Sequence, residues 1–161
     1  MFTVNLIAVG KLKESYLREA FAEYSKRLNA FCKFSITELS EYRLSENPSQ
    51  KEIEQGLSAE GKAIASLLQS FGGYSYALCI EGKQLSSEEL SAGMNTIALN
   101  GTSTLNFIIG SSYGLSSDIK NICDFKLSMS KMTFPHQLAR IMLSEQIYRA
   151  FQISANSKYH K

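Results

Sequence analysis

Residues 72–110, GGYSYALCIEGKQLSSEELSAGMNTIALNGTSTLNFIIG, contain a complete strand–helix–strand unit. The Gly-Gly pair is followed by the apolar stretch 74–80, which predicts a strand that ends at Glu81-Gly82. Ser86 and Glu89 have the spacing of a capping box, so a helix is predicted to begin there and to stop at Asn100-Gly101. The apolar stretch 104–109 then predicts the next strand. A strand that follows a helix in this way is typical of an α/β fold with a parallel sheet.

The same alternation continues towards the N-terminus. Apolar stretches predict strands over 2–9 and 34–39, and the polar segment 40–50 is expected to be a loop. Ser49 and Glu52 resemble another capping box, at the start of a helix that extends to residue 71. Between the two strands, four side chains recur at helical spacing and predict one apolar helix face: Leu17, Phe21, Tyr24 and Leu28.

Towards the C-terminus the sequence predicts a short helix capped by Ser116 or Ser117 and a strand over 125–129. A loop over 131–135 and a helix from His136 to about residue 153 follow. The sequence contains no repeat and no linker. We therefore expect one α/β domain over 1–161, with a mainly parallel sheet flanked by helices.

Composition narrows the class of protein. A chain of 161 residues with 44% hydrophobic and 20% charged residues is typical of a globular domain. The formal charge of +2 excludes a strongly basic nucleic-acid coat protein. It does not exclude nucleic-acid binding through a local basic face. No signal peptide or membrane span is expected, and three widely spaced cysteines favour a reducing, cytoplasmic compartment. With only two histidines and no CxxC pair, no metal site is expected.

Three segments follow successive predicted strands and are candidates for a ligand site, because ligands of parallel sheets bind beyond the carboxyl ends of strands. They are residues 78–82, 109–114 and 128–135. Gly110 and Gly114 allow close backbone approach, but they match neither GxGxxG nor a P-loop, and an ordinary tight turn is the alternative. Met132 and Phe134 are suited to holding a flat ligand, and the alternative is that both pack into the core.

The last predicted helix is apolar nearly all round, so it is expected to be buried on more than one side, with a partner subunit on the second side. Positive charge also gathers towards this end of the chain, where it could meet phosphate: Arg140, Arg149, Lys158, His160 and Lys161. A surface ion pair between Glu145 and Arg149, and a solvated basic tail, are the alternatives.

Four segments together resemble one known family over nearly the whole chain. They are AVGKLKE (8–14), LCIEG (78–82), FIIGSSYGL (107–115) and SKMTFPHQLARIMLSEQIYRAF (130–151), with YHK at the end. These segments resemble the RlmH family, small SPOUT-superfamily methyltransferases of bacterial large-subunit ribosomal RNA. The segment from residue 130 onward is long and specific.

The resemblance implies a SPOUT-type α/β fold with a C-terminal trefoil knot, which pattern reading alone would not propose because knots are essentially absent from proteins. It implies a homodimer that binds S-adenosylmethionine in the knot. The implied cofactor-binding residues are Leu78, Gly110, Met129, Ser130, Lys131, Met132, Thr133 and Phe134. One departure is visible, because Ser111 stands where relatives often have a second glycine, and its side chain would crowd or hydrogen-bond the ligand.

The resemblance further implies methylation of N3 of a pseudouridine (pseudouridine-1915) in 23S rRNA, on the assembled 70S ribosome. Such a reaction needs alignment of donor and acceptor and removal of a weakly acidic proton, but no metal. Four residues are candidates for this chemistry: Arg149, Tyr159, His160 and His136. For His136, a structural role at the helix start is as good an explanation. The alternatives are a methyltransferase of the same fold acting on tRNA or another rRNA site, and a non-enzymatic ribosome-binding module.

Overall fold

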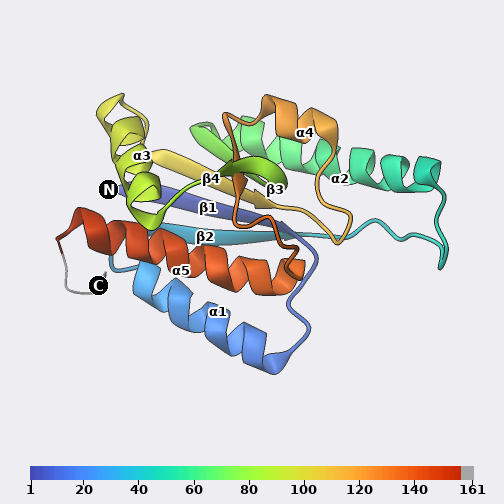
Figure 1. The fold of residues 1–161 in the computed structure, drawn as a ribbon, viewed down its shortest axis with the longest axis horizontal. Coiled ribbons are helices and arrows are strands. Elements are labelled where there is room, and N and C mark those ends of the chain that lie inside the picture. Colours follow the sequence, from blue (N-terminus) through green and yellow to red (C-terminus); the bar gives the residue numbers. More distant parts are fainter. Residues whose placement is uncertain (157–161) are drawn as a thin grey trace.

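The computed structural model describes residues 1–156 and contains a five-stranded sheet in the order β2-β1-β4-β3-β5, in which all named strands pair in parallel (Figure 1). The prediction of an α/β fold with a parallel sheet is thereby confirmed. The strands are β1 (Phe2–Val9), β2 (Cys32–Leu39), β3 (Tyr74–Gln84), β4 (Thr104–Ile109) and β5 (Phe125–Ser128).

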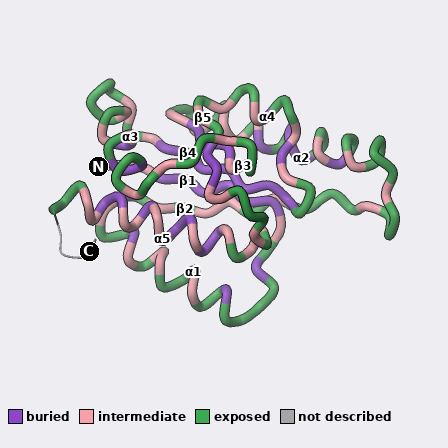
Figure 2. The backbone as a smooth tube through the Cα atoms, in the orientation of Figure 1, coloured by how far each residue is buried: buried purple, intermediate pink, exposed green. Residues whose placement is uncertain are grey.

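Five helices cover the two faces of this sheet, as Figure 1 shows. One face packs against α1, α3 and α5 around Leu6, Phe107 and Leu143, and the other against α2 and α4 around Ile7, Ile64 and Ile108. Figure 2 shows that the buried residues follow the central strands. The helices are α1 (Ser15–Leu28), α2 (Gln50–Phe71), α3 (Ser87–Leu99), α4 (Ser117–Ile122) and α5 (His136–Ser154).

The helix starts follow the capping residues closely. Ser86 and Glu89 form a complete capping box at α3, and Ser116 caps α4 through the backbone N–H of Ile119. At α2 only half of the expected box is present. Ser49 accepts a hydrogen bond from the backbone of Glu52, but the Glu52 carboxylate accepts one from the hydroxyl of Ser45 instead.

β3 is longer than the sequence predicts. The expected strand stops at residue 80, whereas the observed strand continues to Gln84, with an irregular step between Leu78 and Lys83 where it pairs with β5. Gly82 lies in this step, and a Cβ atom there would lie 2.6 Å from the carbonyl oxygen of Lys126. Glycine therefore lets the backbone of β3 pass close to β5, which explains why a residue typical of a strand end lies inside a strand.

The expectation that a partner subunit covers the second side of the last helix stays a prediction. Within the described chain, α5 packs against both α1 and α3, so part of its apolar surface is not left to a partner. Arg140 is also not part of a basic surface, because its side chain is only 1% exposed. Its guanidinium donates to Glu38 on β2 at 2.6 Å and to the carbonyl of Gly10, just after β1, at 2.9 Å.

A row of polar side chains crosses the sheet on the face towards α2. Asn5 of β1 is paired in register with Ser35 of β2 on one side and Asn106 of β4 on the other. Asn5 donates to Asn106 and accepts from Ser35, both at 2.8 Å, and Asn106 donates to the carbonyl of Gly72 at the end of α2. The row thus fixes the alignment of three strands and the position of one helix end.

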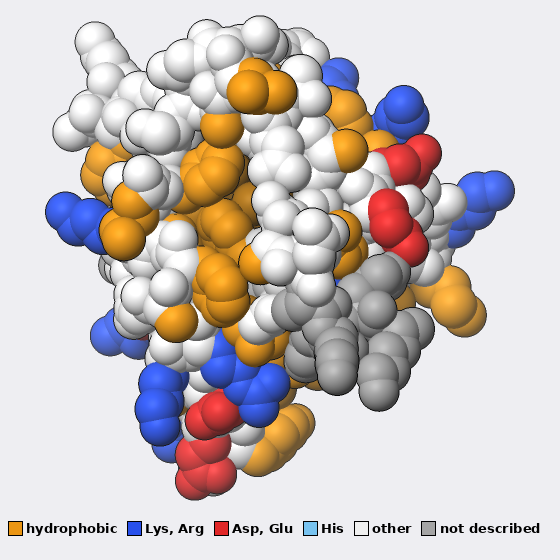
Figure 3. Space-filling view, turned by 90° about the vertical axis from the view of Figure 1, so that its left-hand side faces the viewer, with side chains coloured by type: hydrophobic (Ala, Val, Ile, Leu, Met, Phe, Trp, Pro, Cys, Tyr) orange, Lys and Arg blue, Asp and Glu red, His pale blue; other side chains and the backbone are white. Residues whose placement is uncertain are grey.

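The two ends of the molecule differ. Figure 3 shows a band of hydrophobic side chains at the end opposite to the carboxyl ends of the strands. Met1 and Leu99 are 95% and 88% exposed, respectively. Among the described residues, no helix has the length and apolar character that crossing a membrane requires. The trefoil knot stays a prediction, and the strand order, with β5 beyond β3 and α5 returning to α1, is compatible with it.

Candidate functional site

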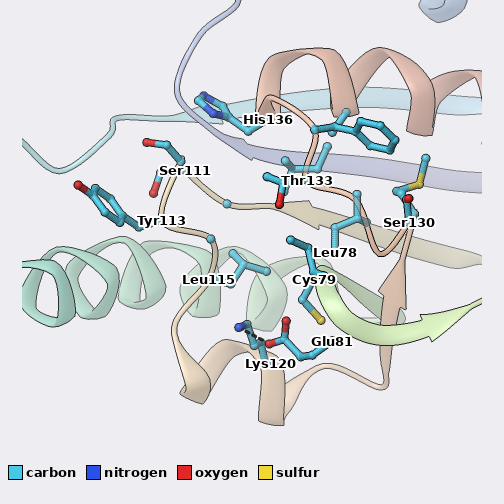
Figure 4. A pocket seen from close by; sticks show the side chains of 18 of the residues that line it. Leu78, Cys79, Glu81, Ser111, Tyr113, Leu115, Lys120, Ser130, Thr133 and His136 are labelled. Carbon is cyan, nitrogen blue, oxygen red and sulfur yellow. Dashed lines mark hydrogen bonds and ion pairs between the residues drawn. The ribbon is translucent and has the colours of Figure 1, made fainter. Parts of the chain in front are cut away.

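A pocket of about 390 Å³ lies beyond the carboxyl ends of β3, β4 and β5 (Figure 4). This volume is within the range of small-molecule sites in proteins. The three segments that the sequence singled out supply most of the wall. The lining residues include Leu78, Cys79, Glu81, Ile109, Gly110, Ser111, Tyr113, Leu115, Lys120, Met129, Ser130, Met132, Thr133, Phe134 and His136.

The wall after β4 is a tight turn from Gly110 to Gly114. Ser111 and Gly114 form an isolated antiparallel bridge, and the N–H of Gly114 donates to the carbonyl of Ser111 at 2.8 Å. A Cβ atom at Gly110 would lie 2.2 Å from the carbonyl oxygen of Gly114, and Gly114 itself has φ of +82°. The turn therefore requires glycine at both positions. The segment is therefore a tight turn that also lines a pocket, so the two readings that the sequence presented as alternatives are compatible.

Opposite this turn lies the loop between β5 and α5. The hydroxyl of Ser130 accepts a hydrogen bond from the backbone N–H of Met132, and the hydroxyl of Ser128 donates to the carbonyl of Ser130. These contacts hold the loop in a compact form. Met132 does not pack into the core, because its side chain is 75% exposed, and Phe134 is half-buried at the pocket. The alternative in which both residues simply fill the core is thus wrong.

Seven of the eight residues expected to bind a cofactor line this pocket: Leu78, Gly110, Met129, Ser130, Met132, Thr133 and Phe134. Lys131 is exposed and is absent from the lining. The structure therefore brings together segments from three strand ends, as a parallel sheet requires. That these residues bind a cofactor stays a prediction.

His136 is the first residue of α5 and lies at the edge of the same pocket. Burial lowers the pKa of its imidazole below the usual range, and Arg140 and Lys13 act in the same direction, while Glu41 opposes them. No hydrogen bond joins its ring to the backbone in the described part of the chain, so the expected alternative of a backbone-bonded histidine lacks its contact. A neutral imidazole beside a pocket is able to accept a proton.

Of the other three catalytic candidates, only Arg149 lies within the described residues, and it does not line the pocket. Arg149 lies on α5, where its guanidinium donates to Glu145 at 2.8 Å, and this confirms the expected ion pair. The side chains of Arg149 and Glu145 are 25% and 17% exposed. Tyr159 and His160 lie outside the described residues. Their roles and that of Arg149 therefore stay predictions.

Two charged features of the site were missed from the sequence. Lys120 of α4 forms an ion pair with Glu81 at the pocket wall, and its ammonium group lowers the pKa of the Glu81 carboxyl. Glu60 of α2 is only 7% exposed and accepts a hydrogen bond from Ser111. The sequence does hold a signal for it, because Glu60 falls on the same helix face as Leu57 and Ile64 and so interrupts an apolar face with a carboxylate.

The pocket suits an organic ligand with a flat apolar part. Its walls offer the apolar side chains Leu78, Leu115 and Phe134, beside backbone groups of a glycine turn and the hydroxyls of Ser130 and Thr133. Among residues 1–156, His, Cys, Asp and Glu side chains do not gather in groups of three or more that would hold a metal ion. An adenosyl group that carries an amino-acid chain would suit these apolar walls and hydrogen-bonding groups.

Comparison with known proteins adds three findings. A family model described as "Predicted SPOUT methyltransferase" matches residues 2–160. Ribosomal RNA large subunit methyltransferases H of Bifidobacterium adolescentis and Leuconostoc mesenteroides are each 49% identical over 158 residues, which are 98% of this chain and 99% of theirs. The crystal structure of a probable methyltransferase from Bordetella pertussis has a similar fold, with a TM-score of 0.56 at 9% identity over 93% of this chain and 95% of that one.

Proposed function

This chain belongs to the SPOUT methyltransferase family, and from that premise we propose that it methylates large-subunit ribosomal RNA with S-adenosylmethionine as the methyl donor. The observation that carries the proposal is the match over almost the whole length to relatives named for this activity. The pocket at the ends of β3, β4 and β5 supports it, since it has the size and chemistry for the adenosyl donor.

The finer proposal is that the acceptor is N3 of a pseudouridine (pseudouridine-1915) in 23S rRNA, on the assembled 70S ribosome in the bacterial cytoplasm. The described chain is a single sheet with its helices and shows no second unit for RNA recognition. A particle that already presents the target nucleotide would supply recognition beyond what this one sheet and its helices offer.

In the proposed mechanism, the sulfonium of S-adenosylmethionine supplies an electrophilic methyl group. The residues of the chain then have two tasks, alignment and proton removal. The turn at Gly110 and the loop from Met129 to Phe134 would hold the donor between them. His136, neutral at the pocket edge, would take the proton from N3 or stabilise its loss. Arg149, Tyr159 and His160 would face the RNA and hold it over the methyl group.

We propose that these last three residues reach the pocket from a second copy of the chain. On the described surface, a hollow of about 240 Å³ between the starts of α1 and α5 exposes apolar side chains next to His136. Tyr16 and Leu138 in this hollow are 66% and 40% exposed. A homodimer that covers them would bury apolar surface and would bring one subunit close to the other subunit's pocket.

Transfer of a labelled methyl group to intact ribosomes and to isolated subunits tests the proposal, with mass mapping of the modified nucleotide. We expect label in 23S rRNA of the 70S particle, at one pseudouridine. Label in tRNA or at another rRNA position would favour a different substrate of the same fold. Absence of heat in a calorimetric titration with S-adenosylmethionine would favour a non-enzymatic binding module.

Removal of residues 157–161 tests the role of the tail. The expected result is loss of methyl transfer with little change in the affinity for S-adenosylmethionine, because the residues expected to hold the cofactor lie between Leu78 and Phe134. A truncated protein that methylates ribosomes at the normal rate would show that Tyr159 and His160 take no part in the reaction.

A further inference from the structure

A buried carboxylate on α2 joins the turn from Gly110 to Gly114, at the pocket, to the loop after β2. Glu60 is 7% exposed, and its two oxygens have different partners. Oε1 accepts from the hydroxyl of Ser111, which is itself 7% exposed and lies in the pocket turn, at 3.3 Å. Oε2 accepts from the backbone N–H of Tyr42, in the loop after β2, at 2.9 Å. One side chain therefore contacts two segments: the turn from Gly110 to Gly114, called the cofactor turn below, and the loop after β2.

The loop after β2 is fixed on α2 by a second contact. A Cβ atom at Gly56, one helical turn before Glu60, would lie 2.9 Å from Cδ1 of Tyr42, so glycine makes room for this ring. The residue before Tyr42 is Glu41, which lies beside His136. A Cβ atom at Gly10 would lie 3.7 Å from Oε2 of Glu41 and 3.8 Å from Nε2 of His136. The loop that Glu60 holds thus places a carboxylate, that of Glu41, close to the proposed base.

We propose that Glu60 is a positioning residue of the site, which holds the cofactor turn through Ser111 and the Glu41–Tyr42 loop through the backbone of Tyr42. Burial is the main reason that the pKa of its carboxyl is raised, and the bonds from Tyr42 and Ser111 oppose that effect. A buried carboxyl group is retained at a cost in desolvation unless its hydrogen bonds offset it. The role rests on the proposed function only in naming S-adenosylmethionine as the ligand of the turn.

The proposal also explains a role for Ser111, which stands where relatives often have a second glycine. The Ser111 side chain points to α2 through its bond to Glu60. It therefore neither crowds the pocket nor needs the ligand as a partner. Where glycine occupies this position, the turn lacks this link and its alignment depends on the backbone alone.

Four variants separate a positioning role from a merely structural one. Glu60→Ala removes both bonds, and Ser111→Ala removes only the bond to the turn. Glu60→Gln keeps both, since the amide oxygen accepts from Tyr42 N–H and the amide N–H donates to the Ser111 oxygen. Glu54→Ala, on the exposed face of the same helix, is the matched control.

Hydrogen exchange without any ligand gives the first readout. Glu60→Ala is expected to speed exchange of the Tyr42 and Gly114 amides by roughly tenfold, since each depends on a segment that Glu60 holds. Ser111→Ala should speed exchange of Gly114 but not of Tyr42. Glu60→Gln and Glu54→Ala should match the wild type. Unchanged exchange of both amides in Glu60→Ala would overturn the proposal.

Calorimetric titration with S-adenosylmethionine gives the second readout. We expect Glu60→Ala and Ser111→Ala to weaken binding by roughly tenfold, which is about 1.4 kcal/mol, and Glu60→Gln to restore it. Equal loss in Glu60→Gln and Glu60→Ala, or normal binding by Ser111→Ala, would contradict the role. If the wild type binds no S-adenosylmethionine, the proposed function fails, and the exchange rates alone then decide about Glu60.

Discussion

His136 controls the expected pH dependence of the reaction. Its pKa is lowered by burial, so the neutral imidazole persists below the ordinary histidine value of about 6.5. If the neutral form accepts the N3 proton, the acid limb of the kcat/KM profile lies at a lower pH than an unshifted histidine would give. The negative charge of Glu41 raises the pKa of His136 and so reduces the shift of the acid limb towards lower pH.

The measurement is a pH profile of methyl transfer by the wild type and by His136→Gln. The variant should lose roughly 100-fold in rate, as is typical when a general base is removed, and its profile should lack the acid limb. A variant with normal rate and an unchanged limb would show that His136 only shapes the pocket edge.

Gly110 tests the cofactor turn itself. In Gly110→Ala the new methyl group would meet the carbonyl oxygen of Gly114 at 2.2 Å, so the turn must move. The affinity for S-adenosylmethionine should fall by more than roughly tenfold, because the displaced backbone no longer matches the ligand. Gly93→Ala on α3, where the nearest atom lies 4.0 Å away, is the control. It should bind normally and be more stable by about 0.5 kcal/mol. Normal binding by Gly110→Ala would contradict the assigned site.

At the scale of elements, Arg140 ties α5 to the ends of β1 and β2. We expect Arg140→Ala to lower the free energy of unfolding by about 3 kcal/mol, the low end of the cost of breaking a buried ion pair, because a third of the Glu38 side chain remains in water. Urea unfolding measures the change. Arg27→Ala, which breaks an exposed pair with Glu23, should cost less than about 1 kcal/mol. Similar losses in both variants would show that Arg140 contributes no more than a surface pair does.

The elements themselves were accessible from the sequence wherever a local rule governs them. Ser86 with Glu89, and Ser116, mark helix starts through bonds only three residues apart. The extension of β3 past residue 80 was not accessible, because it depends on β5 passing close to Gly82, and β5 lies more than forty residues further along the chain. The same reason hid the partners of Glu60 and Arg140, whose bonds span from 18 to 130 residues.

The candidate site was predictable to the extent that it follows from topology. Parallel strands bring their carboxyl ends to one edge, so the three segments had to meet there. The placement of His136 at the pocket edge follows from the loop before α5. The exclusion of Lys131 from the wall depends on the exact path of that loop, which no spacing rule determines. The domain extent of 1–161 also stays a prediction, since the last five residues lie outside the described part.

At the scale of the whole molecule, the proposed dimer predicts that two inactive variants restore activity when they are mixed. A chain without residues 157–161 keeps its pocket, and Gly110→Ala keeps its tail. Each is expected to be inactive alone. If the tail of one chain serves the pocket of the other, a mixture allowed to exchange subunits should recover roughly a quarter of the wild-type rate, since half the pairs are mixed and each has one complete site. No recovery would mean that each chain completes its own site.

α5 supplies Leu143, Ile147 and Phe151 to the core that Val4, Leu6 and Leu28 begin. During synthesis, which adds about 5–20 residues per second, these early residues leave the ribosome long before their partners are made. Glu38 and the carbonyl of Gly10 likewise lack their hydrogen-bond donor until Arg140 has been synthesised. A nascent chain that stalls before residue 136 thus exposes an open apolar face and remains open to proteases and chaperones. The core on this face is therefore complete only once the last helix has left the ribosome and packed.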